Sequence, residues 1–227
     1  MSLSRRDLIL GLGATTLMGA TNPVMANSHS NPFKQGSSTK NWVALTFDDG
    51  PHPTLTPKLL DHLKERRLKA TFYLIGWRVK QNPQLVKRIA REGHDIGNHS
   101  YWHPNLAAVG NKRLLNEIDK TNAAIVDVIG KKPKTMRPPY GALSLRQSRL
   151  LLEERKLPSI MWSLDTRDWK RPGSHYIANR IINHAQSGSV ILSHDIHGAT
   201  IRAMPKALDH LKKEFRLVTI SKMIAQS

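Results

Sequence analysis

The segment WVALTFDDGP, residues 42–51 of this 227-residue chain, predicts both the first strand of the fold and the place of its functional site. Its first six residues form a short, mostly apolar run, which predicts a buried β-strand over residues 42–47. Gly50 and Pro51 then favour a turn, so that Asp48 and Asp49 stand where the strand passes into a loop. These four residues could be a turn and nothing more, and their meaning depends on what other segments bring to this place.

Further short apolar runs, separated by amphipathic helical patterns, predict six more strands. They cover residues 71–75, 95–98, 135–137, 159–164, 190–193 and 216–218. The helical patterns include residues 83–91, an apolar stripe between Leu114 and Gly130, and another between Ile177 and Gly188. The alternation predicts an α/β protein with a parallel sheet, either open or closed into a barrel. With 39% hydrophobic residues and no long linker, the chain predicts one domain.

Polar residues follow the carboxyl ends of the predicted strands, which is where functional loops lie in parallel α/β folds. Asp48 and Asp49 follow the first strand. The third to sixth strands are followed in turn by His99, Arg137, Asp165 and His194. Because the carboxyl ends of parallel strands meet at one edge of the sheet, the sequence predicts a single site there.

Two histidines four residues apart, His99 and His103, would project their rings to the same side if they lay on a helical turn. In a chain with eleven histidines such a pair could be a coincidence. Together with Asp49 it forms a set of two imidazoles and one carboxylate, which leaves positions open for water and substrate. We therefore predict Asp49, His99 and His103 as ligands of a divalent metal ion, with Zn2+ expected and Co2+ or Ni2+ as alternatives.

Five segments together resemble, in order, the motifs of the polysaccharide deacetylase family, also called the NodB-homology domain or carbohydrate esterase family 4. They are TFDDGP at residues 46–51, HSYWHP at 99–104, RPPYG at 137–141, DTRDW at 165–169 and ILSHD at 191–195. The resemblance extends from Asn41 to about Val218. It implies a distorted (β/α)7 barrel in a single domain, which we assign to residues 41–227, and it agrees with the seven strands counted above.

The resemblance also implies roles for the polar residues of the site. Asp48 would be the general base, Arg137 would hold it, and His194 would be the general acid. The carboxylate that orients His194 would be Asp168, with Asp165 as the alternative that the sequence leaves open.

Two aromatic residues complete the predicted site. The backbone N–H of Tyr140 would help to stabilise an oxyanion, and the rings of Tyr140 and Trp169 are candidates for contact with a sugar. The implied function is hydrolysis of N-acetyl groups on N-acetylglucosamine-containing glycans, such as peptidoglycan or chitin, to acetate and a free amine. Two alternatives stay open: an O-acetyl esterase of the xylan type, and a basic protein that binds glycan or nucleic acid without turnover.

The N-terminus predicts a removable signal peptide over residues 1–26, because Arg5 and Arg6 precede a weakly hydrophobic stretch. The paired arginines resemble a twin-arginine signal. An uncleaved anchor is the alternative, although the apolar run falls short of the roughly 20 residues that span a bilayer. We expect an exported protein, periplasmic or extracellular, with no transmembrane span in its mature form. Residues 27–40 are polar and predict a flexible lead-in.

The formal net charge is +18, and the chain has no cysteine that could form a disulfide. This charge favours anionic partners. We expect an acetylated polysaccharide or oligosaccharide as substrate and electrostatic association with anionic envelope polymers, and we do not expect nucleic acid. Five further histidines do not complete the metal pattern and are expected to be structural or exposed: His52, His94, His175, His184 and His197.

Overall fold

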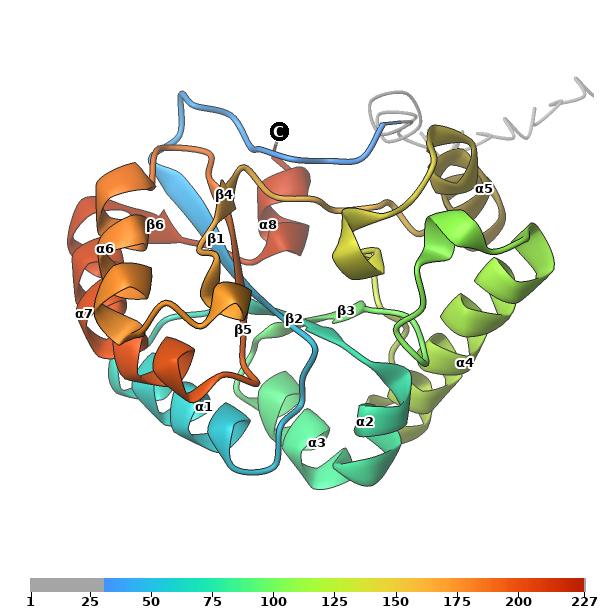
Figure 1. Cartoon of the computed structure of the whole chain (residues 1–227), viewed down its shortest axis with the longest axis horizontal. Coiled ribbons are helices and arrows are strands. Elements are labelled where there is room, and N and C mark those ends of the chain that lie inside the picture. Colours follow the sequence, from blue (N-terminus) through green and yellow to red (C-terminus); the bar gives the residue numbers. More distant parts are fainter. Residues whose placement is uncertain (1–30, 227) are drawn as a thin grey trace, which may run out of the picture.

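A parallel sheet surrounded by helices forms the centre of the protein (Figure 1). The computed structural model describes residues 31–226, so the predicted signal peptide of residues 1–26 lies outside the described residues. The strands are β1 (Trp42–Asp48), β2 (Thr71–Leu74), β3 (Asp95–Asn98), β4 (Leu164–Asp165), β5 (Val190–His194) and β6 (Arg216–Leu217). Their order is β3-β2-β1-β5-β4, and β6 pairs with the beginning of β1.

Strand β1 lies in the middle of this sheet and is buried from residue 43 to residue 48. A strand covered on both faces needs mostly apolar residues at successive positions, and the sequence VALTF supplies them. Its one polar side chain, Thr46, donates a hydrogen bond to the carbonyl oxygen of Ile191. The register pairs Asp48 with Tyr73 of β2 and with His194 of β5. The end of β1 is therefore fixed between two neighbouring strands, and Asp48 begins the site in the most constrained part of the sheet.

The barrel closes through an irregular segment rather than through two more strands. The predicted strands at residues 135–137 and 159–164 are reduced to isolated bridges, Asn98 with Met136 and Met136 with Ser159, and only the end of the second reaches β4. The physical reason is that the Arg137 side chain donates hydrogen bonds to the carbonyl oxygens of Ile160 and Met161, which a regular strand would use for its neighbour. The predicted α/β class is confirmed, and the distortion of the barrel is located here.

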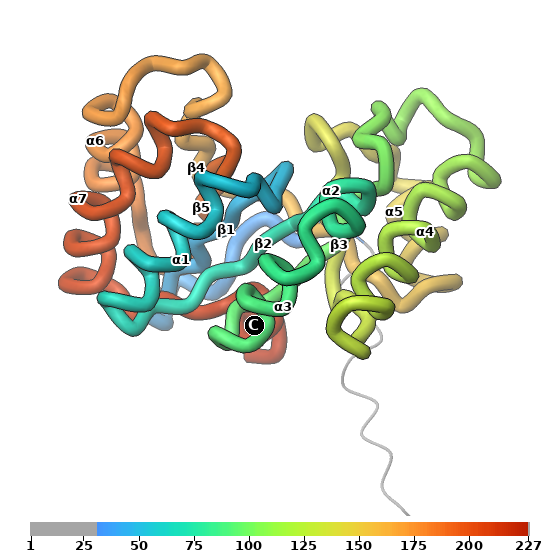
Figure 2. The backbone as a smooth tube through the Cα atoms, turned by 90° about the horizontal axis from the view of Figure 1, so that it is seen from below, coloured from blue at the N-terminus to red at the C-terminus, as the bar shows by residue number. Residues whose placement is uncertain are grey.

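Eight α-helices cover the outside of the sheet in the described residues (Figure 2). They are α1 (Leu55–Glu65), α2 (Gly76–Gln81), α3 (Pro83–Arg91), α4 (Asn111–Ile129), α5 (Leu145–Arg155), α6 (Ser174–His184), α7 (Gly198–Glu214) and α8 (Ile220–Ile224). Three short 3-10 turns, η1 (Leu106–Ala108), η2 (Pro139–Gly141) and η3 (Asp168–Lys170), lie in the loops. The predicted helix at residues 83–91 is confirmed as α3, and the two apolar stripes lie on α4 and α6.

The apolar faces of these helices meet the sheet in one large core. Leu59 and Leu63 of α1, together with Leu208 of α7, pack with Phe47 and Phe72 of the sheet, and all five are fully buried. Burial of one such side chain stabilises the fold by about 1.5–3 kcal/mol.

Helix α4 is capped at its C-terminus by Gly130, whose φ of 69° is left-handed and suits a glycine.

The chain joins the folded unit before Asn41. Phe33 pairs with Ile160, and Gln35 pairs with Ser189. Phe33 also packs against an apolar cluster beside the barrel. The predicted start at Asn41 and the flexible lead-in therefore need correction for residues 31–40, because this polar segment supplies backbone hydrogen bonds that the irregular closure of the barrel leaves available. Residues 27–30 of the predicted lead-in lie outside the described residues.

The loops that leave β1, β3 and β5 all emerge at the carboxyl edge of the sheet, where Asp49, His99 and the residues after His194 begin. This edge is the one that the sequence predicts for the site. Within residues 31–226, no helix combines the length and the apolar character that crossing a membrane demands.

Candidate metal and catalytic site

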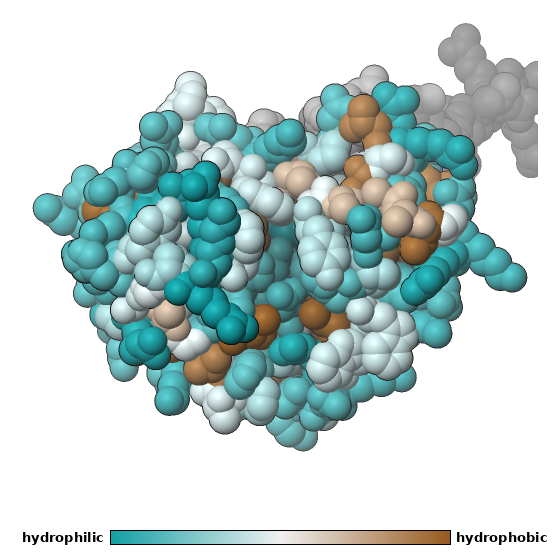
Figure 3. Space-filling model, viewed as in Figure 1, coloured by the Kyte–Doolittle hydropathy of each residue, from teal (hydrophilic) through white to brown (hydrophobic). Residues whose placement is uncertain are grey.

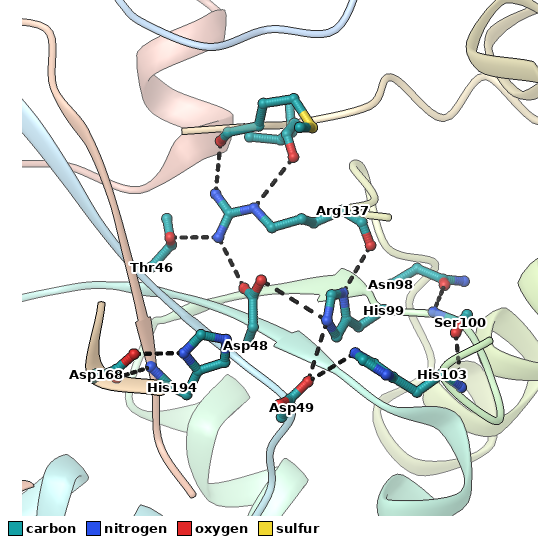
Figure 4. Close-up of polar contacts among 12 residues, drawn as sticks. Thr46, Asp48, Asp49, Asn98, His99, Ser100, His103, Arg137, Asp168 and His194 are labelled. Carbon is teal, nitrogen blue, oxygen red and sulfur yellow. Dashed lines mark hydrogen bonds and ion pairs between the residues drawn. The ribbon is translucent and has the colours of Figure 1, made fainter. Parts of the chain in front are cut away.

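Three side chains from two loops meet at the carboxyl edge of the sheet (Figure 4). Oδ1 of Asp49 lies 3.3 Å from Nε2 of His99 and 3.2 Å from Nε2 of His103. One ligand atom from each of the three lies within 4.8 Å of the others. Oδ1 of Asp49 is buried and accepts no hydrogen bond from the described residues. A buried oxygen without a partner, facing two imidazole nitrogens, is the arrangement that a divalent cation would satisfy.

The electrostatics of this cluster favour a charged carboxylate. Burial by itself would raise the pKa of Asp49, but the His103 and His99 rings outweigh it and hold that pKa well below its usual range. Nδ1 of His99 lies 2.8 Å from the carbonyl oxygen of Arg137 and so donates to it. This leaves Nε2, on the side of Asp49, as the nitrogen of His99 that can bind a cation.

The loop that carries the two histidines is not helical, so the helical turn considered for residues 99–103 is wrong. Ser100 and His103 each have a φ of 60°, and these two left-handed residues fold the loop back on itself. The ring centroids of His99 and His103 come within 5.0 Å of each other in this way. The two rings therefore lie together as predicted, but a compact loop rather than a helical turn places them there.

Two residues that sequence reasoning missed hold this loop. Glu117 of α4 is buried and accepts hydrogen bonds on Oε2 from the backbone N–H groups of Tyr101 and Trp102, at 2.9 and 2.8 Å. Asn98, at the end of β3, accepts one on Oδ1 from the N–H of Ser100 at 2.8 Å. The role of Glu117 could have been predicted from the sequence. Its carboxylate lies within the apolar stripe of α4, and a buried carboxylate needs a hydrogen-bond partner.

Asp48 and Arg137 form a buried ion pair beside the three-residue cluster. Nη1 of Arg137 donates to Oδ1 of Asp48 at 2.8 Å and to Oγ1 of Thr46 at 2.6 Å. Nε and Nη2 bind the carbonyl oxygens of Ile160 and Met161, so the guanidinium cannot turn away. Oδ2 of Asp48 remains 3.8 Å from Nε2 of His99 and faces the cluster. The sequence pairs Asp48 with Arg137, and the structure brings the two together.

His194 lies next to Asp48 because β1 and β5 pair these residues directly. Nδ1 of His194 is 2.7 Å from Oδ1 of Asp168, and its backbone N–H donates to Oδ2 of the same carboxylate at 2.7 Å. Thr200 of α7 donates a third hydrogen bond to Asp168. Burial would lower the pKa of His194, but the hydrogen bond to Asp168 outweighs it and raises this pKa to about 9.

The alternative carboxylate of this segment, Asp165, binds its own loop instead. Its Oδ1 accepts from the N–H of Arg167 at 2.7 Å, and its Oδ2 accepts from Nε1 of Trp169 at 3.3 Å. Of the two carboxylates that the sequence leaves open, Asp168 is the one in contact with His194.

An open cleft of about 400 Å³ connects the three-residue cluster with Asp48 and His194. Asp48, Asp49 and His194 lie among its lining residues, and Figure 3 shows the hollow in the middle of this face. Tyr140 and Trp169 line it as well and are 69% and 51% exposed, as a surface for a sugar ring would be.

The backbone at Tyr140 adds a polar group to the cleft. Its φ is 59°, and the turn around it satisfies the N–H groups of Gly141 and Ala142 through Pro138 and Pro139. The N–H of Tyr140 itself donates to none of the described residues. It is therefore a free donor on a residue whose ring centre lies 4.6 Å from that of His103.

The five further histidines that were singled out from the sequence lie in varied surroundings. His94 is buried against Ala70, whose N–H it accepts, and burial lowers its pKa to about 4. His52 accepts hydrogen bonds at the start of α1, and His175 and His184 lie on α6. His197 alone of the five lines the cleft.

The fold and the site together define an α/β barrel protein with a candidate metal centre at the carboxyl edge of its strands. The chain belongs to the polysaccharide deacetylase family, whose model matches residues 35–158.

Relatives within this family cover most of the chain. A peptidoglycan-N-acetylglucosamine deacetylase of Bacillus cereus is 42% identical over 85% of this chain and 71% of the relative. The deacetylase PgdA of Listeria monocytogenes is 41% identical over 84% of this chain, but the match spans only 40% of that longer protein. The crystal structure of the Bc1960 peptidoglycan N-acetylglucosamine deacetylase has a TM-score of 0.83 and 41% identity, with 88% of this chain and 94% of that chain covered.

Proposed function

We propose that this protein is a metal-dependent deacetylase that hydrolyses N-acetyl groups of N-acetylglucosamine-containing glycans to acetate and a free sugar amine. One observation carries the proposal: Asp48 and His194, neighbours across β1 and β5, flank the cluster of Asp49, His99 and His103 in one open cleft. The deacetylases named above, which share the family and about two fifths of the sequence, support the same substrate class.

The residues fit a divalent ion, and we propose zinc. Asp49, His99 and His103 would hold it, because they offer one unpartnered carboxylate oxygen and two imidazole nitrogens. Cobalt and nickel accept the same ligands. A bound ion of this kind would polarise the acetyl carbonyl and make water easier to deprotonate at neutral pH.

The proton transfers follow from the positions of the protein side chains. Asp48, fixed by Arg137, takes a proton from water as the water oxygen attacks the carbonyl carbon of the acetyl group. The free N–H of Tyr140 is available to stabilise the negative charge that develops on the carbonyl oxygen. His194, protonated because its pKa is raised, gives its Nε2 proton to the sugar nitrogen as the C–N bond breaks. Acetate and a free amine leave the site.

Acetate release tests this proposal directly. Chito-oligosaccharides, peptidoglycan and acetylxylan would be offered to the wild type and to the Asp48→Ala and His194→Ala variants, with Asp119→Ala on the exposed face of α4 as control. We expect the wild type and the control to release acetate from the N-acetylated substrates, and the two site variants to lose most of this turnover. Undiminished activity of either site variant would refute the assigned roles, and activity on acetylxylan alone would favour an esterase.

We also propose that the protein is exported by the twin-arginine route, on the basis of Arg5 and Arg6 in the sequence. Replacement of both by Lys is expected to leave an unprocessed precursor inside the cell, which immunoblots of cell fractions would detect. Normal export of this variant would contradict the proposed twin-arginine route.

A further inference from the structure

Four cationic side chains lie within five residues in the chain of Trp169 or His197, which line the cleft, and we call them the cationic rim: Arg167, Lys170, Arg171 and Arg202. The first three lie in the loop between β4 and α6, and Arg202 lies in the second turn of α7. All four are exposed. Figure 3 shows strongly hydrophilic surface along this side of the hollow, over the part of the fold that Figure 1 draws in orange.

The cationic rim is in contact with residues that line the cleft. Nζ of Lys170 lies 5.1 Å from the ring centre of Trp169. Burial lowers the pKa of His197, which also lines the cleft, and the charge of Arg171 acts in the same direction. A guanidinium nitrogen of Arg202 lies 3.2 Å from where a Cβ on Gly198 would be, so this side chain lies over the first turn of α7, which follows His197.

The charges of the cationic rim have no carboxylate partner among the described residues. Within residues 31–226, none of the four side chains forms an ion pair or a side-chain hydrogen bond, whereas Arg66, Arg88 and Arg155 elsewhere each bind carboxylates. The two acidic residues of the same loop, Asp165 and Asp168, are engaged by backbone N–H groups, Trp169, Thr200 and His194. The rim therefore carries four exposed positive charges that no carboxylate of the described residues pairs with, in segments that also carry residues of the cleft wall.

The backbone conformation of two rim residues does not favour arginine. Arg167 and Arg171 have left-handed φ values of 57° and 55°, which glycine or asparagine would adopt with less strain. Residues placed against local preference at the edge of a site point to a role in binding.

We propose that the cationic rim binds carboxylate groups of the glycan, so that the protein acts on anionic strands in preference to neutral ones. The inference rests on the proposed function and names its substrate class. Guanidinium groups suit carboxylates because two N–H donors match two oxygens. In peptidoglycan the carboxylates are of two kinds, the lactyl group of the neighbouring sugar and the ends and side chains of the peptide stem.

The test compares three substrates of equal sugar length: a neutral chito-oligosaccharide, an alternating oligosaccharide with lactyl carboxylates, and the same oligosaccharide with peptide stems. We expect the wild type to show a kcat/KM about tenfold higher on a carboxylate-bearing substrate, as two or more exposed ion pairs would give. High salt should remove most of the preference, because these charges are in contact with solvent. If the preference is already present with the lactyl-bearing oligosaccharide, the rim binds lactyl carboxylates. If it appears only with the stem-bearing oligosaccharide, the rim binds carboxylates of the peptide. Both results support the proposal.

Charge variants separate the rim from the net charge of the protein. The rim variant carries Arg167→Gln, Lys170→Gln, Arg171→Gln and Arg202→Gln. The control carries Lys64→Gln, Lys131→Gln, Lys132→Gln and Lys212→Gln, four exposed cations at or after the C-terminal ends of helices, at the edge of the barrel away from the cleft. We expect the ratio of kcat/KM on carboxylated over neutral substrate to fall about tenfold in the rim variant and to persist in the control.

The proposal that the cationic rim binds carboxylates would be overturned if the wild type had equal kcat/KM on all three substrates. It would also be overturned if the rim variant kept the wild-type ratio of kcat/KM on carboxylated over neutral substrate. Absence of acetate release from every substrate would instead refute the proposed function. In that case equilibrium binding of the stem-bearing oligosaccharide still decides the inference, because the rim variant should bind it about tenfold more weakly than the control does, and equal binding would contradict it.

Discussion

At the scale of single residues, Arg137 connects more parts of the site than any other side chain described above. It is fully buried, it pairs with Asp48, and its remaining donors bind Thr46 and two backbone carbonyls. Its own carbonyl oxygen accepts from His99. One residue thus fixes the candidate base, one candidate metal ligand and the closure of the barrel.

Replacement of Arg137 by Met should lower the free energy of unfolding by about 3–5 kcal/mol, because Asp48 would keep a buried charge without its partner. Denaturant unfolding followed by circular dichroism measures this. Arg155→Met, which breaks an exposed pair with Asp119, provides the comparison and should cost no more than about 1 kcal/mol. Equal losses in the two variants would contradict the assigned importance of the buried pair.

His194 supplies a prediction about pH. Its pKa is raised to about 9 mainly by Asp168, against the effect of burial, so a general acid at this position is protonated below that pH and loses its proton above it. Activity should therefore fall as the pH rises through about 9. In Asp168→Asn this basic limb should move down toward the ordinary histidine value of about 6.5.

The control for this experiment is Asp165→Asn, which alters a carboxylate of the same loop that binds Arg167 and Trp169 instead. The pH dependence of kcat over pH 6–10 would be measured for the three proteins. A basic limb that moves in Asp165→Asn and stays in Asp168→Asn would reverse the assignment.

At the scale of elements, the helices act as supports for loops that emerge at the carboxyl edge. Helix α4 holds the histidine loop through Glu117, and α7 holds Asp168 through Thr200. Neither contact is local in sequence, since Glu117 follows Tyr101 by 16 residues and Thr200 follows Asp168 by 32.

Glu117→Ala should loosen the loop of His99 and His103 and weaken metal binding by about 10–100-fold, the usual effect when a partner that orients ligands is lost. Competition with a chromophoric chelator measures the affinity for Zn2+. Asp119→Ala changes a carboxylate on the exposed face of the same helix and should leave the affinity unchanged. The Glu117→Gln variant keeps a side-chain oxygen that can accept a hydrogen bond but has no charge. If it restores the affinity for Zn2+, the hydrogen bonds to the loop matter rather than the charge of Glu117.

At the scale of the whole molecule, the candidate metal centre joins loops after β1 and β3, so a bound ion should stabilise the entire barrel. With zinc at about 100 times its dissociation constant the gain is about 2.7 kcal/mol. For a domain of this size that corresponds to a Tm higher by roughly 5–10 °C. Calorimetry with zinc and with a chelator measures it.

The Asp49→Ala variant is the control for this effect. The change removes only atoms that face the open cleft, so the variant should fold, and its Tm should no longer respond to zinc or chelator. A zinc-dependent shift of equal size in this variant would mean that the ion binds elsewhere.

Much of the fold and of the site could be predicted from local patterns. The apolar run before Asp48 predicts β1, helix α3 falls where the apolar face and Pro83 indicate, and the polar residues after the strands point to the carboxyl edge. These features depend on backbone hydrogen bonding and on side-chain periodicity, which act over a few residues and are visible in any one segment.

Only the tertiary structure decided the rest. Asp168 rather than Asp165 contacts His194, the histidine loop is folded by left-handed residues rather than by a helical turn, and Phe33 pairs with Ile160. The carbonyls that a regular strand would use are bound by Arg137. The sequence by itself determined which side chains lie at the site, because strand ends in a parallel sheet share one edge. Which of them touch depends on distances between segments far apart in the chain, and packing alone sets those distances.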